Sequence, residues 1–235
     1  GDGAGGADVA TVSVAVSAVN DVPTAAPRTA TTKYQTATTI TLTGADVETC
    51  DLTFQVVTPP GHGTLGTPSN VLCVTLLPPY ADSSKIVYTP AAGYSGADSF
   101  TYRTSDGTAW SPPATVAITV AAPILVHVGD LDGSKTVQTT TWTAKVTIRV
   151  HNAGEANVNA VTVTGVWSSG ASGTATCKTS SSGVCTVSKG SIPKTTRSVT
   201  FTVTGMTVAA GAYAPTANHD PETDSTGTAI VVSGP

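Results

Sequence analysis

The amino-acid sequence predicts an all-β protein: two tandem β-sandwiches that follow an isolated N-terminal strand. Charged residues make up only 11% of the 235 residues, against about 25% in a typical globular domain. Threonine and valine are abundant, and β-branched residues favour pleated sheets. Short alternations of apolar and polar residues recur between Gly- and Pro-rich turns, as they do in sandwiches. A chain of this length can bury two separate cores.

Residues 10–18 form the first alternating segment, and their valines are expected on one face. Residues 114–120 repeat the pattern about one sandwich further along. We interpret the later segment as the last strand of a complete domain. The earlier one is then the last strand of a preceding domain, which this chain lacks. An unpaired strand can add to a sheet of another molecule. The candidate self-assembly residues are Ala10, Val12, Val14, Val16 and Ala18.

The first sandwich is expected over residues 22–121, after a strand and junction at residues 1–21. Its strands are predicted at residues 40–42, 52–56, 71–77, 86–88, 99–103 and 115–120. Leu52, Phe54 and Val56 share one face by alternation, and so do Phe100 and Tyr102. These side chains are predicted to form its core.

The second sandwich is expected over residues 122–235. Its clearest strand covers residues 141–150, where five apolar residues alternate with polar ones. They are Trp142, Ala144, Val146, Ile148 and Val150. Further strands are predicted at residues 161–163, 174–177, 184–187, 199–203 and 228–232.

The first half carries a recognisable motif at residues 88–107, which read YTPAAGYSGADSFTYRTSDG. Together with the NDVP junction at residues 20–23 and GADVETCDLTFQVVTPPGHGTL at residues 44–65, it resembles bacterial cadherin-like repeats. The resemblance covers residues 20–121 and implies an Ig-like fold whose acidic residues bind calcium at repeat junctions. One departure concerns that site, since Thr49-Cys50 replaces the usual Gly-Asp of the acidic turn.

The second half resembles Ig-like modules at the C-termini of secreted bacterial hydrolases. The motifs are VGDLDG at residues 128–133, CKTSSSGVC at 177–185, GSIPK at 190–194 and ANHDPETDSTGT at 217–228. This resemblance implies an accessory role in a secreted enzyme.

Acidic residues are the candidate calcium ligands, because calcium takes six to eight oxygen ligands. In the first half they are Asp21, Asp46, Glu48, Asp51, Asp98 and Asp106. In the second half they are Asp130, Asp132, Asp220, Glu222 and Asp224, which we expect to meet at one pole. The alternative is a set of solvated turns in which aspartates cap the backbone.

The four cysteines form two local pairs, although three pairings can be drawn. Pairing within each domain is the simplest, and it joins Cys50 to Cys73 and Cys177 to Cys185. Disulfides indicate an oxidising, extracellular or cell-surface setting. The absence of a CxxC motif and of histidines spaced as ligands disfavours a cysteine metal site.

Several functional classes are disfavoured by composition and motif. A net charge of −4 and a pI near 5.4 argue against a nucleic-acid partner, and no apolar run reaches the 18 or so residues that span a bilayer. A GxSxG nucleophile motif and a phosphate loop are both lacking. His62, His127, His151 and His219 are scattered along the sequence. The sequence therefore predicts a non-enzymatic protein.

Two functions remain open. The first is a structural or adhesive surface module that binds neighbouring repeats or forms filaments head to tail through residues 10–18. The second is a C-terminal accessory module of a secreted hydrolase that binds an extracellular glycan. A sugar platform needs exposed rings, and only Trp110 and Trp167 lie beside turns that could expose them; buried rings there would instead plug a sandwich end.

Overall fold

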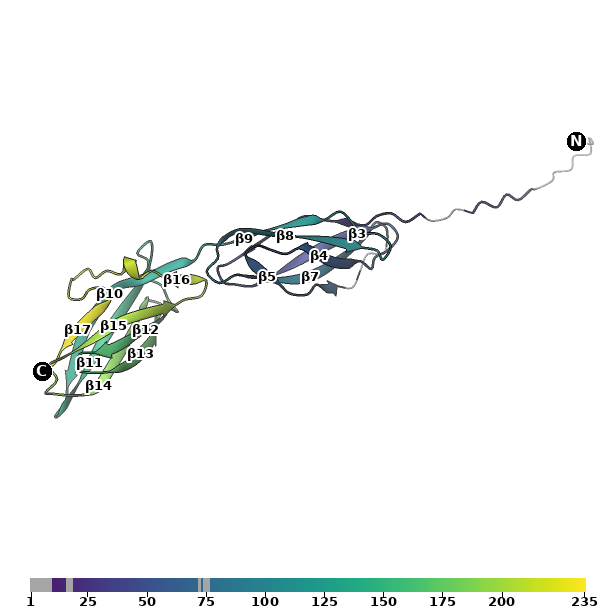
Figure 1. Ribbon diagram of the computed structural model, residues 1–235. Helices are drawn as coiled ribbons and strands as arrows, with labels where there is room; N and C mark the ends of the chain where they lie inside the picture. Colours follow the sequence, from purple (N-terminus) through teal and green to yellow (C-terminus); the bar gives the residue numbers. More distant parts are fainter. Residues whose placement is uncertain (1–9, 16–18, 72, 74–76) are drawn as a thin grey trace, which may run out of the picture.

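The computed structural model describes residues 10–15, 19–71, 73 and 77–235. In this part of the chain every regular element is a strand except one short 3₁₀ helix, η1 (Pro215–Ala217), so the predicted all-β class is confirmed. The strands form four sheets that pack as two sandwiches, one after the other along the chain (Figure 1).

In the residues that the structure describes, the first sandwich consists of nine strands in two sheets. They are β1 (Thr24–Ala25), β2 (Arg28–Thr32), β3 (Thr38–Asp46), β4 (Thr53–Thr58), β5 (Gly63–Leu65), β6 (Ser69–Val71), β7 (Tyr80–Pro90), β8 (Gly96–Ser105) and β9 (Ala114–Val120). One sheet has the order β1-β3-β7-β5, with β6 also on β7, and the other has the order β2-β9-β8-β4. All pairs are antiparallel except β2 with β9.

The core of the first sandwich contains the side chains that alternation predicted. Leu52 and Phe54 are buried, and Val56 packs against them. Phe100 and Tyr102 on β8 are fully buried, as is Tyr88 on β7. The strand predicted at residues 71–77 is only partly described: β6 ends at Val71, and neither Cys73 nor Leu77 lies in a strand.

The second sandwich contains the remaining strands. They are β10 (Ile124–Val137), β11 (Thr141–Asn152), β12 (Thr162–Ser168), β13 (Gly173–Lys178), β14 (Val184–Pro193), β15 (Ser198–Thr207), β16 (Gly211–Tyr213) and β17 (Ala229–Ser233). The sheet orders are β14-β11-β10-β16 and β13-β12-β15-β17. The five alternating residues of β11 are all fully buried, as predicted.

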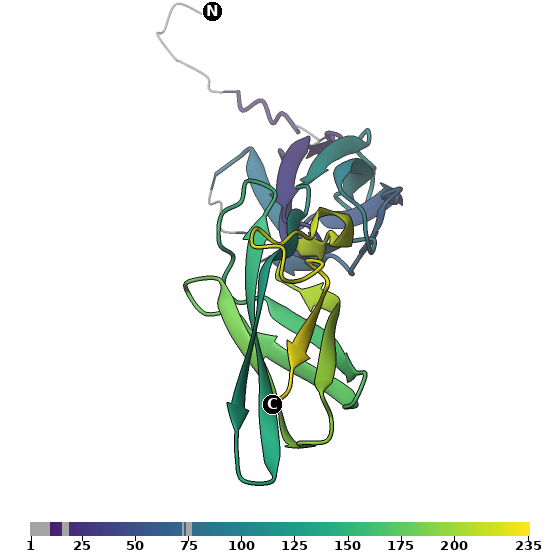
Figure 2. The ribbon, with the colours of Figure 1, turned by 90° about the vertical axis from the view of Figure 1, so that its left-hand side faces the viewer.

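Strand β10 was not predicted from the sequence, because glycines and aspartates interrupt its apolar pattern. It forms a long hairpin with β11, which Figure 2 shows as a twisted ribbon. A β-bulge between Val128 and Asp130 shifts the register, which turns the following side chains relative to the sheet.

Both disulfides join the cysteines that local pairing predicted. Cys50 is bonded to Cys73, with Cα atoms 5.8 Å apart, and Cys177 to Cys185, with Cα atoms 5.7 Å apart. The second disulfide links the neighbouring ends of β13 and β14, strands that belong to opposite sheets. It therefore closes one side of the second sandwich.

The N-terminal segment differs from its prediction. Residues 10–15 form no strand and run away from the first sandwich (Figure 1). Val12 and Val14 are 81% and 78% exposed, so the segment does not fold back onto its own chain. A strand requires a hydrogen-bonded partner, and none is present for these residues. Val16 and Ala18 lie outside the described residues.

Candidate functional site

The acidic residues of the first sandwich fall into separate places. Asp21 donates its backbone N–H to Glu48 Oε2 at 3.3 Å, and Asn20 Nδ2 donates to Asp106 Oδ2 at 2.8 Å, so these residues share one end. Asp98, by contrast, lies at the start of β8 while Asp106 follows its end, which places them about 26 Å apart. The six residues are therefore not one ligand set.

Two of these carboxylates accept hydrogen bonds from nearby backbone N–H groups. Asp46 Oδ1 accepts hydrogen bonds from the N–H groups of Glu48 and Thr49 at 2.9 and 2.8 Å. Asp106 Oδ1 accepts from Thr108 and Ala109 at 2.6 and 2.7 Å. Each carboxylate therefore caps a turn. Turn capping was the alternative to calcium binding in the sequence analysis.

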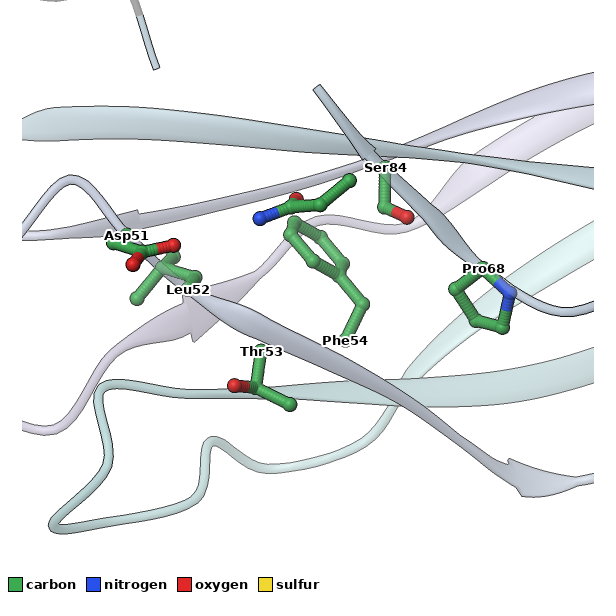
Figure 3. A pocket seen from close by; sticks show the side chains of 7 residues that line it. Asp51, Leu52, Thr53, Phe54, Pro68 and Ser84 are labelled. Carbon is green, nitrogen blue, oxygen red and sulfur yellow. The ribbon is translucent and has the colours of Figure 1, made fainter. Parts of the chain in front are cut away.

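Asp51 follows the turn that Asp46 caps, and its N–H donates to Thr49 Oγ1 at 3.3 Å. It lines a pocket of about 220 Å³ at the outer edge of β4, with Phe54, Pro68 and Ser84 among the other lining residues (Figure 3). It is the only carboxylate among the pocket residues. The pocket therefore offers one carboxylate, whereas calcium takes six to eight oxygen ligands.

Asp98 has a structural role within the family motif. Its carboxylate accepts hydrogen bonds from the Tyr88 hydroxyl at 2.8 Å and from the N–H groups of Gly61, His62 and Ser99. Burial alone raises the pKa of Asp98, but these four hydrogen bonds outweigh it and hold the pKa below its ordinary value. Burial, together with the Asp98 charge, raises the pKa of Tyr88. The motif thus fixes the turn before β5.

The acidic residues of the second sandwich do gather at one pole. Ligand atoms of Asp130, Asp220 and Glu222 lie within 4.8 Å of one another. Burial and then the charges of Asp132, Glu222 and Asp220 raise the pKa of Asp130, although Arg149 lies 3.9 Å away. Asp130 Oδ1 and Asp220 Oδ2 are buried without a hydrogen-bond partner. This pole therefore concentrates negative charge, which Arg149 only partly neutralises.

Three of the four histidines, although scattered along the sequence, converge beside this acidic pole. His127 on β10 and His151 on β11 are direct partners in the strand register, so their side chains share one face. His219 comes from the loop that follows η1. The three ring centroids are 5.1 to 6.1 Å apart. Only the pairing of β10 with β11 and the folding of the C-terminal loop bring them together.

The loop that carries His219 is held against β10 by three hydrogen bonds. The Ala214 N–H donates to Val126 O at 2.8 Å, and the Val128 N–H donates to Asn218 Oδ1 at 2.9 Å. The His219 N–H then donates to Val128 O at 3.0 Å. Gly227, with a φ of 74°, packs against the His219 backbone. The position of His219 is therefore fixed by backbone contacts.

Glu155 lies between the three imidazoles. Its carboxylate is 3.1 Å from His151 Nδ1, 3.4 Å from His219 Nε2 and 3.5 Å from His127 Nε2. Burial raises the pKa of Glu155, but the His151 hydrogen bond and the charges of His127 and His219 outweigh it and lower the pKa. Glu155 adopts a φ of 59° in the turn after β11. Such a φ is uncommon outside glycine.

The indole rings do not form a sugar platform. Trp167 is only 4% exposed and packs on Phe201 with ring centroids 4.9 Å apart, so it plugs the core. Trp110 is 41% exposed, but the Arg103 guanidinium lies 4.2 Å over its ring.

The part of the chain that the structure describes contains no helix able to cross a membrane.

Comparison with known proteins identifies the first sandwich. Residues 20–119 match the family model described as a bacterial Ig domain. No curated protein matches the chain.

Two solved structures resemble the chain distantly. An endo-fucoidan hydrolase from glycoside hydrolase family 107 matches 91% of this chain and 28% of its own, with 16% identity and a TM-score of 0.35. The Yersinia pseudotuberculosis adhesin InvE matches 78% of this chain and 55% of its own, with 17% identity and a TM-score of 0.23. The chain thus spans less than a third of the hydrolase. At these TM-scores the likeness carries no argument about function.

The family match and the predicted motifs cover the same stretch, from the NDVP junction to the last strand of the first sandwich. Residues 20–119 are therefore a bacterial Ig domain.

Proposed function

We propose that the chain is a non-catalytic, extracellular structural module whose copies assemble head to tail through residues 10–18. The observation that supports this proposal is the N-terminal segment. Val12 and Val14 alternate with polar residues and are 81% and 78% exposed, outside every sheet of their own chain. An alternating apolar segment of this kind fits a sheet edge on another copy. The two disulfides suit an extracellular setting.

The second sandwich of the preceding copy offers the acceptor edge in this proposal. Strand β17 is last in its sheet, and Val231 on it is 58% exposed. Strand β10 pairs with β16 only at Ile124–Val126, so its later residues have β11 as their one neighbour. A groove of about 290 Å³ runs between these two edges. An added strand can lie along it.

The positions of the segments suit a head-to-tail contact. Residues 10–15 lie at one end of the molecule, and β17 belongs to the sandwich at the other end (Figure 1). A contact between unlike surfaces that does not close on itself produces a filament. The same contact would leave the first sandwich free as a spacer.

Electron microscopy and light scattering test the assembly. The full chain is compared with a chain that lacks residues 1–19 and with two matched double variants. Val12→Asp with Val14→Asp changes the apolar face, whereas Thr11→Asp with Ser13→Asp adds the same charge to the other face. We expect filaments from the full chain and the second variant only. Monomers from all four proteins would refute strand donation and favour the accessory module, which a glycan-binding screen then tests.

We also propose that calcium binds the acidic pole of the second sandwich. The buried, unpaired oxygens of Asp130 and Asp220 support this proposal, because a divalent cation would supply their missing partner. Calcium titration by calorimetry should show one site that Asp130→Asn weakens. Asp106→Asn, whose carboxylate caps a turn in the first sandwich, should leave the affinity unchanged. Equal affinities for both variants would refute the site.

A further inference from the structure

We propose that His127, His151, His219 and Glu155 form a binding site for a transition-metal ion of the zinc class. The four residues come from β10, β11, the turn after β11 and the loop after η1. Each offers one ligand atom, and these atoms all lie within 4.8 Å of one another. Imidazole nitrogens with one carboxylate are a donor set that zinc accepts. Calcium, in contrast, takes oxygen ligands.

The strongest indication is the unpaired nitrogen of His127. The side chain of His127 is 3% exposed, and its Nε2 has no hydrogen-bond partner. Its nearest charged atom is Glu155 Oε1 at 3.5 Å. A buried polar atom without a partner is unfavourable, and native structures rarely leave one. A metal ion between the imidazoles would take the lone pair of this nitrogen.

The ring of His219 is oriented to present its other nitrogen. Its Nδ1 lies 3.2 Å from Ala217 O. A carbonyl oxygen only accepts, so this contact requires the proton on Nδ1, and in the neutral imidazole the Nε2 lone pair is then free. Nε2 is the atom that faces Glu155 at 3.4 Å. Metal-bound histidines commonly have their second nitrogen fixed in this way.

The position of the His151 ring depends on Gly129. A Cβ atom on Gly129 would overlap the His151 ring, so any other residue there would displace the imidazole. Gly129 also lies in the β-bulge that separates the histidine face from the acidic pole. The missing side chain of Gly129 and the β-bulge thus leave space for the histidine rings.

The four ligand atoms need only a small rearrangement to reach the spacing of a metal site. In a tetrahedral zinc site with bonds of about 2.05 Å, ligand atoms are about 3.3 Å apart. Glu155 already lies 3.1 to 3.5 Å from one nitrogen of each imidazole. Its side chain is 59% exposed and can move outward to admit the ion. The ion would then tie the C-terminal loop to the β10–β11 hairpin.

Zinc titration of the full, chelator-stripped chain tests the proposal, with a chromophoric chelator as competitor. We expect one Zn²⁺ per chain, a higher melting temperature with Zn²⁺, and the visible absorption of tetrahedral Co²⁺ when cobalt replaces zinc. His219→Gln changes a half-exposed side chain and should weaken binding by at least about 10-fold. Glu155→Gln should also weaken it.

Two controls separate this site from others. His62→Gln alters the remaining histidine, in the first sandwich, and should leave Zn²⁺ affinity unchanged. Glu222→Gln alters the neighbouring acidic group and should also leave it unchanged. The proposal is overturned if the chain binds no Zn²⁺, or if His219→Gln binds as tightly as the unmodified chain. Loss of binding in Glu222→Gln alone would instead assign the ion to the acidic pole.

Discussion

The hydroxyl group of Tyr102 should stabilise the first sandwich by joining its two sheets. Tyr102 lies on β8 and is fully buried. Its hydroxyl oxygen is 2.6 Å from Ala26 O and 2.7 Å from Thr43 O, and it accepts the Thr43 N–H at 3.2 Å. The single proton can serve one carbonyl at a time. The Tyr102→Phe variant keeps the ring and removes only this oxygen.

The expected loss follows from the partners left behind. Each neutral hydrogen bond contributes about 1 kcal/mol net, and a buried polar group without a partner costs about 1 to 3 kcal/mol. The Thr43 N–H and the Ala26 carbonyl both lose the hydroxyl. We therefore expect a destabilisation of about 2 to 3 kcal/mol. In a domain of about 100 residues, this corresponds to a melting temperature lower by roughly 8 °C or more.

Differential scanning calorimetry of the full chain measures this effect. The transition of the second sandwich, which does not contact Tyr102, provides an internal reference. The control is Tyr80→Phe, since the Tyr80 hydroxyl makes no hydrogen bond in the part of the chain that the structure describes. If Tyr102→Phe lowers stability by no more than about 0.5 kcal/mol relative to Tyr80→Phe, the hydroxyl does not bridge the sheets.

Three further predictions concern stability. Gly165→Ala should destabilise the second sandwich by more than about 2 kcal/mol, because its Cβ would overlap the Phe201 ring, whereas Gly205→Ala, with open space around it, should change the urea midpoint little. The pKa of Asp98 is lowered in the folded chain, so the ionised carboxylate contributes fully to the free energy of unfolding above its ordinary pKa of 3.8. This contribution is lost as the pH falls through the lower pKa of the folded state. The urea midpoint should therefore fall less between pH 7 and pH 2 in Asp98→Asn than in the unmodified chain. Replacing Cys177 and Cys185 together by serine should cost about 2 to 3 kcal/mol, since the disulfide closes a short loop with a sequence separation of 8; an unchanged thermal midpoint would contradict it.

The sequence carried most of the information about the strands and their inner faces. Side chains alternate along a strand, so the pattern in residues 141–150 predicted the buried face of β11 without knowledge of its neighbours. Phe100 and Tyr102 were placed in the core by the same rule. The cysteine pairs were also predictable, because each pair is close in sequence.

The strand β10 shows where this rule fails. Its run from Gly129 to Gly133 contains two glycines and two aspartates, and its last residues are exposed. Its stability comes from pairing with β11, an interaction that local alternation does not reveal. Had β10 been recognised, the hairpin register alone would have placed His127 opposite Asn152, because only the bulge between Val128 and Asp130 shifts the partner to His151.

The N-terminal segment shows the converse case. Its alternation is as regular as that of β9, and yet residues 10–15 form no strand. Alternation describes which side chains share a face, whereas a strand also needs a neighbour for its backbone. The sequence can predict the first of these conditions but not the second.

The sequence by itself determined the fold class, the inner faces of the strands and the cysteine pairs, because each depends on local periodicity or short separation. Only the tertiary structure decided which polar residues meet. It joined His127, His151 and His219 from three distant segments of the chain. Strand register and loop docking set these distances, and neither leaves a local signal in the sequence.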